Sequence, residues 1–261
     1  LDGGVWGSKA IKEAKLFGDV EVVASSKDRN YSYLPTGYAI PENAAYFHYT
    51  TNNTIEGTQM GDIPSTPVPL IADMSSDVLS CGMDFNRFSF IYAGAQKNIG
   101  AAGVNLVVAD KDFLATGNTA IPSMMDYRQH VANGSMLNTP PVFAIYVCLL
   151  TLRWLKKIGG IPAIEKINEQ KANLLYTTLA SLPMFNLPVP SQDRSKMNAV
   201  FTMHDPALEK LFLTRCKEEG MIGIKGHRSV GGFRVSMYNA MPLSSVVDIT
   251  DLIKDFANKH A

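Results

Sequence analysis

The sequence predicts an α/β protein whose large domain contains a mainly parallel sheet. Short apolar segments follow one another through the first part of the chain, with helical patterns before and after them. Several of these segments are continuously apolar, as is typical of strands buried on both faces. After residues 187–196 (LPVPSQDRSK) the pattern changes to that of a compact α+β unit. We therefore expect a large domain over residues 1–160 and a small C-terminal domain over residues 161–261, which includes a connecting helix.

The large domain is expected to begin with a helix in SKAIKEAKLFG, opened by Ser8 and closed by Gly18. The segments expected to form strands are VEVVAS (20–25), AAYFHYT (44–50), VPLIAD (68–73), FSFIYAG (88–94) and VNLVVAD (104–110). Two long helical patterns follow them, over residues 141–157 and 161–182. The second of these would connect the two domains.

The small domain is expected to alternate strands and helices. Its expected elements are the strand MNAVFTM (197–203), a helix over 206–220, the strands MIGIKG (221–226) and GGFRVSMY (231–238), and a helix from about Ser244. The sequence contains no internal repeat.

Composition limits the classes of partner. The chain is 46% hydrophobic and 18% charged, which is typical of a folded protein with a sizeable core. Lysine plus arginine and aspartate plus glutamate number 24 each, so bulk charge disfavours nucleic acid or an anionic membrane as the main partner. The longest apolar stretch is interrupted by Arg153 and predicts a buried core helix rather than a membrane span. Three separated cysteines favour a reduced, cytoplasmic protein and predict no metal site.

Lys97 is the most informative single residue. It stands among small residues in YAGAQKNIGAAG (92–103), directly after an expected buried strand. Asp73 ends an earlier strand, and the ends of parallel strands meet at one edge of a sheet, where ligands bind. A lysine, an acid and an aromatic face such as that of Trp6 are what pyridoxal phosphate chemistry requires. Other readings stay open: Asp73 as a helix cap, and Trp6 packed against the sheet.

A second cationic cluster lies in KGHRSVGGFR (225–234), which contains Lys225, His227, Arg228 and Arg234. Arginine grips phosphate or carboxylate with a fork of donors, and the glycines around these cations allow close approach of the backbone. We favour an anion site there over a solvated basic turn. A phosphate-binding loop is rejected at Gly7-Ser8-Lys9, because such a loop requires the lysine before the serine. A dinucleotide fingerprint is absent too, because no G-x-G-x-x-G follows an expected strand.

The chain resembles the phosphoserine aminotransferase family along most of its length. The segments that carry the resemblance are WGSKAIKEAKLFG (6–18), NNTIEG (52–57), IADMSSDVLS (71–80), IYAGAQKNIGAAG (91–103), NTPPVFAIYV (138–147), RSKMNAVF (194–201) and KGHRSVGGFRVSMYNAMPL (225–243). That family has the type I fold of pyridoxal-phosphate-dependent transferases and belongs to class V of the aminotransferases. The resemblance therefore implies a mainly parallel, seven-stranded type of sheet.

The resemblance also implies a role for each candidate site residue. For cofactor binding and catalysis these are Lys97 (the Schiff-base lysine and general base), Asp73 (the ring nitrogen), Trp6 (ring stacking), Thr54 (the ring hydroxyl region), Gln96 (the cofactor phosphate), and Asn138 and Thr139 (the cofactor phosphate of the partner subunit). For the substrate they are His227 and Arg228 (the phosphate, across the dimer) and Arg234 (the α-carboxylate).

The implied enzyme is a homodimer with shared active sites. It exchanges an amino group between glutamate and 3-phosphohydroxypyruvate, giving 2-oxoglutarate and O-phosphoserine in serine biosynthesis. Because chains of this family begin well before the position of Trp6, we expect the sequence to be a fragment that lacks an N-terminal part. Two alternatives remain: a non-catalytic remnant that serves as an interaction module, and another aminotransferase of this fold that binds a different anion.

Overall fold

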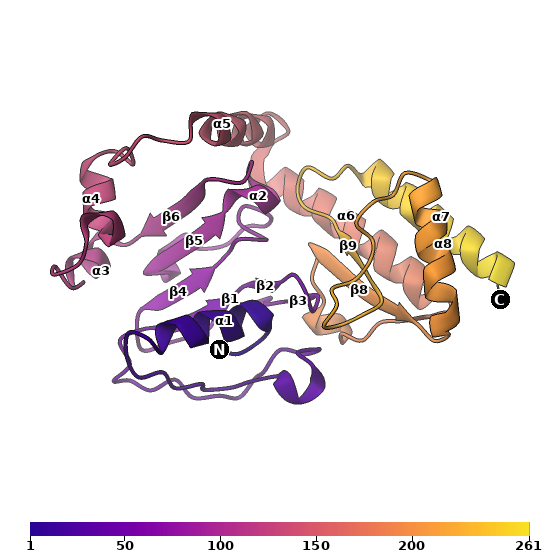
Figure 1. Cartoon of the computed structure of the whole chain (residues 1–261), viewed down its shortest axis with the longest axis horizontal. Coiled ribbons are helices and arrows are strands. Elements are labelled where there is room, and N and C mark those ends of the chain that lie inside the picture. Colours follow the sequence, from indigo (N-terminus) through magenta and orange to yellow (C-terminus); the bar gives the residue numbers. More distant parts are fainter. Residues whose placement is uncertain (261) are drawn as a thin grey trace.

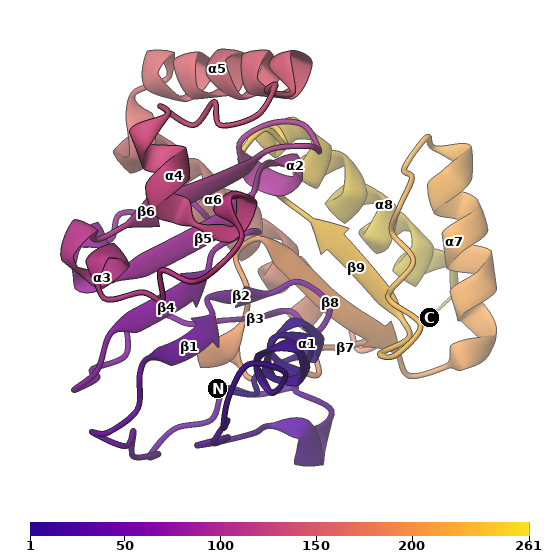
Figure 2. The ribbon, with the colours of Figure 1, turned by 60° about the vertical axis from the view of Figure 1, so that its left-hand side comes forward.

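The computed structural model describes residues 1–260. Two sheets organise the molecule, one formed by the N-terminal part of the chain and one by the C-terminal part (Figures 1 and 2). Each has its own cluster of buried apolar side chains.

The first sheet is mostly parallel, as predicted. Its strands are β1 (Phe47–Thr50), β4 (Leu70–Asp73), β5 (Phe90–Gly94) and β6 (Asn105–Ala109), in the order β1-β4-β5-β6. β1 pairs parallel with β4, and β4 pairs parallel with β5, whereas β6 pairs antiparallel with β5. The described residues contribute four strands to this sheet rather than the seven of the implied family fold. The continuous apolar runs that predicted β4 and β5 are explained by burial, since Ala72, Ile91 and Ala93 are almost inaccessible.

The second sheet is antiparallel and carries helices on one side. Its strands are β7 (Phe185–Asn186), β8 (Asn198–Met203) and β9 (Phe233–Ser236), and its helices are α6 (Gly160–Ala180), α7 (Glu209–Glu218) and α8 (Leu243–His260). An aromatic cluster fills the space between them, with the Phe212 ring edge-on to the rings of Phe233 and Phe256 at centroid distances of 4.8 and 5.1 Å. Such pairs stabilise a core beyond the area that they bury.

The remaining elements connect or flank the two sheets. They are the helices α1 (Val5–Ala14), α2 (Ala95–Asn98), α3 (Lys111–Ala115), α4 (Tyr127–Ala132) and α5 (Val142–Lys157), the short strands β2 (Asn52–Asn53) and β3 (Thr58–Gln59), and the 3-10 turns η1 (Lys27–Arg29), η2 (Phe85–Arg87), η3 (Ser123–Met125), η4 (Ser191–Asp193) and η5 (Pro206–Leu208). Among the described residues, no helix is both long and apolar enough to cross a membrane.

Two segments expected to be strands are not strands. VEVVAS (20–25) makes an isolated bridge, from Ser25 to Asp2, and the Asp2 N–H donates to the carbonyl of Ala24. Val23 packs against the first apolar cluster, but no strand forms. MIGIKG (221–226) makes a single bridge, from Lys225 to Phe233, because Gly223 adopts a left-handed conformation (φ 83°) that breaks the extended backbone. The prediction of a strand in each of these two segments, which rested on their apolar composition, was wrong.

The first helix begins three residues earlier than predicted and ends earlier as well, at Ala14. Its start is set from outside, because the backbone N–H of Val5 donates to the carboxylate of Glu56 at 2.8 Å. The Ser8 side chain does not cap the helix and instead bonds Asp2 and Tyr31. The helix start thus depends on a residue far along the chain.

Helix α5 is not the buried core helix that its composition predicted. Of its 16 residues, three are buried: Ala144, Cys148 and Leu155. Large apolar side chains on the same helix are exposed, including Phe143 (76%) and Tyr146 (54%). Figure 2 shows α5 along one edge of the molecule, with its outer face uncovered. The chain alone leaves this apolar surface open.

Three buried asparagines join the two halves of the molecule. The Asn239 backbone N–H donates to Asn98 Oδ1 at 2.8 Å, and Asn239 Nδ2 donates to the carbonyl of Leu79 at 2.9 Å. Asn168 Nδ2 on α6 donates to both Asn239 Oδ1 and the carbonyl of Ser80. Because all three side chains are at most 4% exposed, these bonds fix the position of α2 relative to the end of β9.

We propose that the boundary between the two expected domains lies at the start of α6. Gly159 and Gly160 both have positive φ there (110° and 71°), a conformation that favours glycine. Gly159 immediately precedes α6, and Gly160 is its first residue. A boundary near residue 160 agrees with this local geometry.

Candidate active site

Lys97 lies on the short helix α2, immediately after β5 ends at Gly94. Its side chain is half-buried, and its amine forms no hydrogen bond or ion pair with any described residue. Burial lowers the pKa of Lys97 below the usual value for lysine, and the nearby carboxylate of Asp73 partly opposes this effect. A partly desolvated, unpartnered amine is suited to act as a nucleophile and as a base.

The position of Lys97 depends on close packing beneath α2. A Cβ on Gly100, just after this helix, would lie 2.3 Å from the sulfur of Cys148 on α5, so only glycine fits. The N–H of Gly94 donates to the Ser75 hydroxyl at 3.2 Å, which ties the start of α2 to the turn after β4. Together these contacts hold the lysine in place at the end of β5.

Asp73 is the last residue of β4, and its register partner on the parallel strand β5 is Tyr92. The ends of β4 and β5 therefore lie at the same edge of the sheet, as the sequence predicted. Asp73 Oδ1 accepts the N–H of Ser75 at 2.9 Å, and its other oxygen accepts no bond from the described residues. One carboxylate oxygen is thus free to bind a ligand.

Trp6 presents an open aromatic face close to Lys97. Its indole N–H donates to the Thr54 hydroxyl at 3.2 Å, and its ring centroid lies 5.5 Å from Lys97 Nζ. The amine of Lys9 is also near, at 4.3 Å from the same centroid. Because Trp6 is 38% exposed, it is not simply packed against the sheet.

The turn over residues 53–57 brings Thr54 to Trp6, and sequence reasoning did not assign a role to its acidic residue, Glu56. Glu56 is 3% exposed and accepts the N–H of Val5, the first residue of α1. This bond fixes the start of the helix and therefore the position of Trp6, the next residue. Burial raises the pKa of Glu56, and the N–H of Val5 opposes this. No periodicity or spacing in the sequence indicated this contact, because its partners are 51 residues apart.

Arg234 on β9 reaches the same turn from the C-terminal sheet. Its Nη1 donates to the carbonyl of Thr54 at 3.0 Å, while its buried Nε has no hydrogen-bond partner. A buried donor without a partner is costly and therefore indicates a missing acceptor. The structure thus gathers Trp6, Thr54, Lys97 and Arg234 around one point.

His227 and Arg228 occupy the tip of a hairpin over residues 224–234. The hairpin is closed by bonds from Gly226 N–H to the carbonyl of Gly232 and from Arg234 N–H to the carbonyl of Ile224, both at 2.8 Å. A Cβ on Gly226 would lie 2.0 Å from a backbone oxygen of Gly231, so this closure requires glycine. Arg228 is exposed, and neither cation contacts Lys97 within this chain.

Asn138, Thr139 and Gln96 are also exposed. Asn138 and Thr139 lie on the segment just before α5, and no hydrogen bond joins them to Lys97, Asp73 or Trp6 within residues 1–260. Gln96 folds its amide back toward Gly94, beside Lys97. The structure of a single chain therefore does not bring Asn138 and Thr139 to the other site residues.

The residues gathered at the sheet edge fit pyridoxal phosphate. A flat ring needs an aromatic face, and Trp6 offers one. A carbonyl carbon needs a free amine, and a protonated ring nitrogen needs a carboxylate, which Lys97 and Asp73 provide. The unpartnered Nε of Arg234 is suited to a substrate carboxylate.

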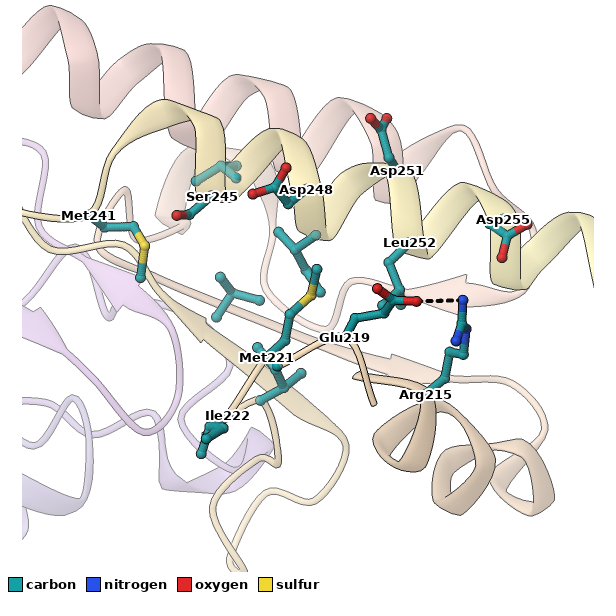
Figure 3. Close-up of a pocket in the computed structure, with 15 residues that line it drawn as sticks. Arg215, Glu219, Met221, Ile222, Met241, Ser245, Asp248, Asp251, Leu252 and Asp255 are labelled. Atoms are coloured by element: carbon teal, nitrogen blue, oxygen red, sulfur yellow. Dashed lines mark ion pairs between the residues drawn. The ribbon is translucent and has the colours of Figure 1, made fainter. Parts of the chain in front are cut away.

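A separate cleft of about 820 Å³ lies between α7 and α8 (Figure 3). Its floor is apolar, and its rim carries four carboxylates, those of Glu219, Asp248, Asp251 and Asp255. The one arginine there, Arg215, pairs with Glu219 at 2.6 Å. Such a rim repels phosphorylated anions, so this cleft does not compete with the sheet edge as a site for them.

Comparison with known proteins also indicates a protein that depends on pyridoxal phosphate. The model of the family aminotransferase class-V matches residues 5–248. The chain therefore belongs to the class-V aminotransferases, which depend on pyridoxal phosphate. A phosphoserine aminotransferase from Flavobacterium johnsoniae is 52% identical over 259 residues, 99% of this chain and 73% of that relative. Within class V, the chain belongs to the phosphoserine aminotransferases.

Two solved structures agree with this placement. Phosphoserine aminotransferase from Bacillus circulans subsp. alkalophilus superposes with a TM-score of 0.97 at 42% identity, covering 100% of this chain and 73% of that one. The PLP-bound phosphoserine aminotransferase from Trichomonas vaginalis gives a TM-score of 0.92 at 36% identity, covering 97% and 74%. These likenesses favour an enzyme over the alternative of a non-catalytic module.

Proposed function

We propose that this chain catalyses the reversible transfer of an amino group between L-glutamate and 3-phosphohydroxypyruvate, giving 2-oxoglutarate and O-phospho-L-serine in serine biosynthesis. The observation that carries the proposal is the unpartnered amine of Lys97, which lies 5.5 Å from the centroid of the Trp6 ring and near the carboxylate of Asp73. The names of the relatives supply the reaction, and this geometry supplies groups that are able to perform it.

The chain's own residues have distinct tasks in this proposal. Bound pyridoxal phosphate supplies an electron-withdrawing ring that stabilises negative charge at the substrate Cα. Lys97 Nζ would take the proton from the substrate Cα and deliver it, on the same face, to the carbon that is the carbonyl carbon of the free cofactor, and the lowered pKa of Lys97 favours its action as a base. Asp73 holds a proton at the ring nitrogen through its free carboxylate oxygen. Trp6 orients the ring by stacking, and Thr54 hydrogen-bonds near the ring hydroxyl.

Substrate binding is assigned to the cationic residues. Arg234 binds the α-carboxylate, because its Nε is buried without a partner and its Nη1 is already anchored to the carbonyl of Thr54. His227 and Arg228 bind the substrate phosphate from the hairpin tip. Gln96, next to Lys97, binds the cofactor phosphate.

The proposed assembly is a homodimer with shared active sites. Its support is the uncovered apolar surface of α5, where Phe143 is 76% exposed, since large exposed apolar patches mark interaction sites. Asn138 and Thr139 directly precede this helix, so a partner seated on α5 would find them close by. In this proposal they bind the cofactor phosphate of the partner subunit, and His227 and Arg228 likewise act across the dimer.

We also propose a cytoplasmic location. The three cysteines (Cys81, Cys148 and Cys216) are free in the structure, which agrees with a reducing compartment.

The test compares amino acceptors. With glutamate as donor, turnover of 3-phosphohydroxypyruvate is measured beside that of hydroxypyruvate, which lacks only the phosphate. We expect kcat/KM to be at least roughly a hundredfold higher for the phosphorylated acceptor, because two charge-assisted contacts are lost without it. Equal values for the two acceptors would assign the chain to another aminotransferase activity.

A further inference from the structure

Asp77 is a buried carboxyl group that the proposed reaction does not use. It lies on the turn that follows β4, four residues after Asp73, and is 3% exposed. Thr51 Oγ1 lies 2.5 Å from Asp77 Oδ1, and Gln59 Nε2 donates to Oδ2 at 3.2 Å. No basic side chain pairs with it among residues 1–260. An ionised, unpaired carboxylate in such a place is costly.

The hydroxyl of Thr51 faces two acceptors at once. Thr51 Oγ1 also lies 3.1 Å from the backbone carbonyl of Asp73, which accepts the N–H of Thr51 at 3.0 Å. A hydroxyl has one hydrogen to donate but two lone pairs to accept with. If Asp77 is ionised, that hydrogen can serve the Asp77 carboxylate or the Asp73 carbonyl, but not both. If Asp77 is protonated, its O–H donates to Thr51 and Thr51 donates to Asp73, so both contacts are made.

The burial of Asp77 and the charge of Asp73 also favour the protonated form of Asp77. The titratable groups that face it are Asp73, Lys97, Tyr49 and Cys81. Burial, with a smaller contribution from the charge of Asp73, raises the pKa of Asp77 to about 7, although the bonds from Thr51 and Gln59 oppose the rise. Lys97 alone among these groups carries positive charge, and its amine makes no bond to Asp77.

We propose that Asp77 is a positioning residue whose protonated form holds the end of β4 through Thr51, so that the Asp73 side chain emerges from a fixed backbone. This inference rests on the proposed role of Asp73 at the cofactor. Asp77 touches neither substrate nor cofactor. It acts by fixing the backbone from which the Asp73 side chain emerges, and by keeping a second negative charge away from Lys97.

The matched variant is Asp77→Asn, because an amide reproduces the protonated carboxyl. Its NH₂ can donate to Thr51, and its oxygen can accept from Gln59. Asp77→Ala removes both contacts. The proposal therefore expects the asparagine variant to keep kcat within about threefold of the unsubstituted enzyme, and the alanine variant to lose at least tenfold in kcat with little change in KM. Asparagine also preserves the volume of the side chain, so the infrared and urea readouts separate a hydrogen-bonding role from space filling.

Two readouts are independent of activity. The first is the infrared carbonyl band of a protonated carboxyl group near pH 6, which is expected in the unsubstituted chain and expected to be lost in Asp77→Asn. The second is the pH dependence of unfolding by urea. A carboxyl whose pKa is raised on folding stabilises the fold at low pH, and this contribution is lost as the pH rises from 3.8 to about 7. The urea midpoint of the unsubstituted chain should therefore fall over that interval relative to that of Asp77→Asn.

The outcomes separate this inference from the proposed function. The absence of the Asp77-dependent band near pH 6, or an asparagine variant as impaired as the alanine variant, would overturn the role of Asp77. If the alanine variant does not fold, the infrared band and the urea comparison still decide with Asp77→Asn alone. A chain that shows the band but transfers no amino group would contradict the proposed function instead.

Discussion

Replacing Lys171 by methionine should destabilise the fold substantially. Lys171 on α6 is fully buried, and its Nζ donates to the carbonyls of Met237, Tyr238 and Met241 at 2.9, 2.9 and 3.1 Å. Each charge-assisted bond is worth about 1.5–3 kcal/mol. Burial of the ammonium costs several kcal/mol and lowers the pKa of Lys171 to about 8, which offsets part of that gain. Methionine fills similar space but donates nothing, so we expect a net loss of about 3 kcal/mol in the free energy of unfolding.

The assay is equilibrium unfolding in urea, with Lys166→Met as the control. Lys166 lies on the same helix but is exposed, so its substitution should change the free energy of unfolding by less than about 0.5 kcal/mol. The carbonyls that Lys171 binds directly follow β9, which carries Arg234, so KM should rise for both substrates. If Lys171→Met were as stable as the control, the three bonds would contribute nothing, and the argument from buried polar groups would be wrong.

Three further predictions concern the site and the assembly. Asp73→Asn should keep the cofactor bound but lower kcat by roughly tenfold or more, since a charge-assisted bond to the ring nitrogen is lost; near-normal turnover would mean that another acid holds that nitrogen. His227→Ala and Arg228→Ala should raise KM for the phosphorylated substrate more than for glutamate, and equal losses in steady-state kinetics would point to a structural role. Phe143→Glu on α5 should convert a dimer to a monomer in analytical ultracentrifugation and abolish amino-group transfer, because each proposed active site needs residues of both subunits. An unchanged dimer would place the interface elsewhere.

The parts of the fold that could be predicted are those whose cause is local. The continuous apolar runs of β4 and β5 indicated buried parallel strands, and the parallel pairing then placed the Asp73 and Lys97 strand ends at one edge. The same reasoning failed for residues 20–25, because an apolar run forms a strand only where a neighbouring strand is available to pair with it. Local composition does not say whether such a neighbour exists.

Contacts between distant segments could not be predicted. Glu56 sets the start of α1 across 51 residues, and Asn239 bonds Asn98 across 141. Burial of α5 was predicted from its composition, but an apolar helix face is also what a subunit interface requires. Buried polar partners such as Thr51 and Asp77 have no periodicity that would distinguish them from surface residues. They are determined by tertiary packing.

The most direct test of the central claim is to find the lysine that carries the cofactor. The chain is incubated with pyridoxal phosphate and reduced with borohydride, which attaches the cofactor permanently to the lysine to which it is linked, and the peptides are then analysed by mass spectrometry. We predict that the label lies on the peptide that contains Lys97, and that Lys97→Ala abolishes both labelling and turnover while leaving the fold intact. Lys9 is the sharpest rival, because its amine lies 4.3 Å from the Trp6 ring centroid, closer than that of Lys97 at 5.5 Å. A label on Lys9, or on Lys225 in the hairpin, would contradict the assignment.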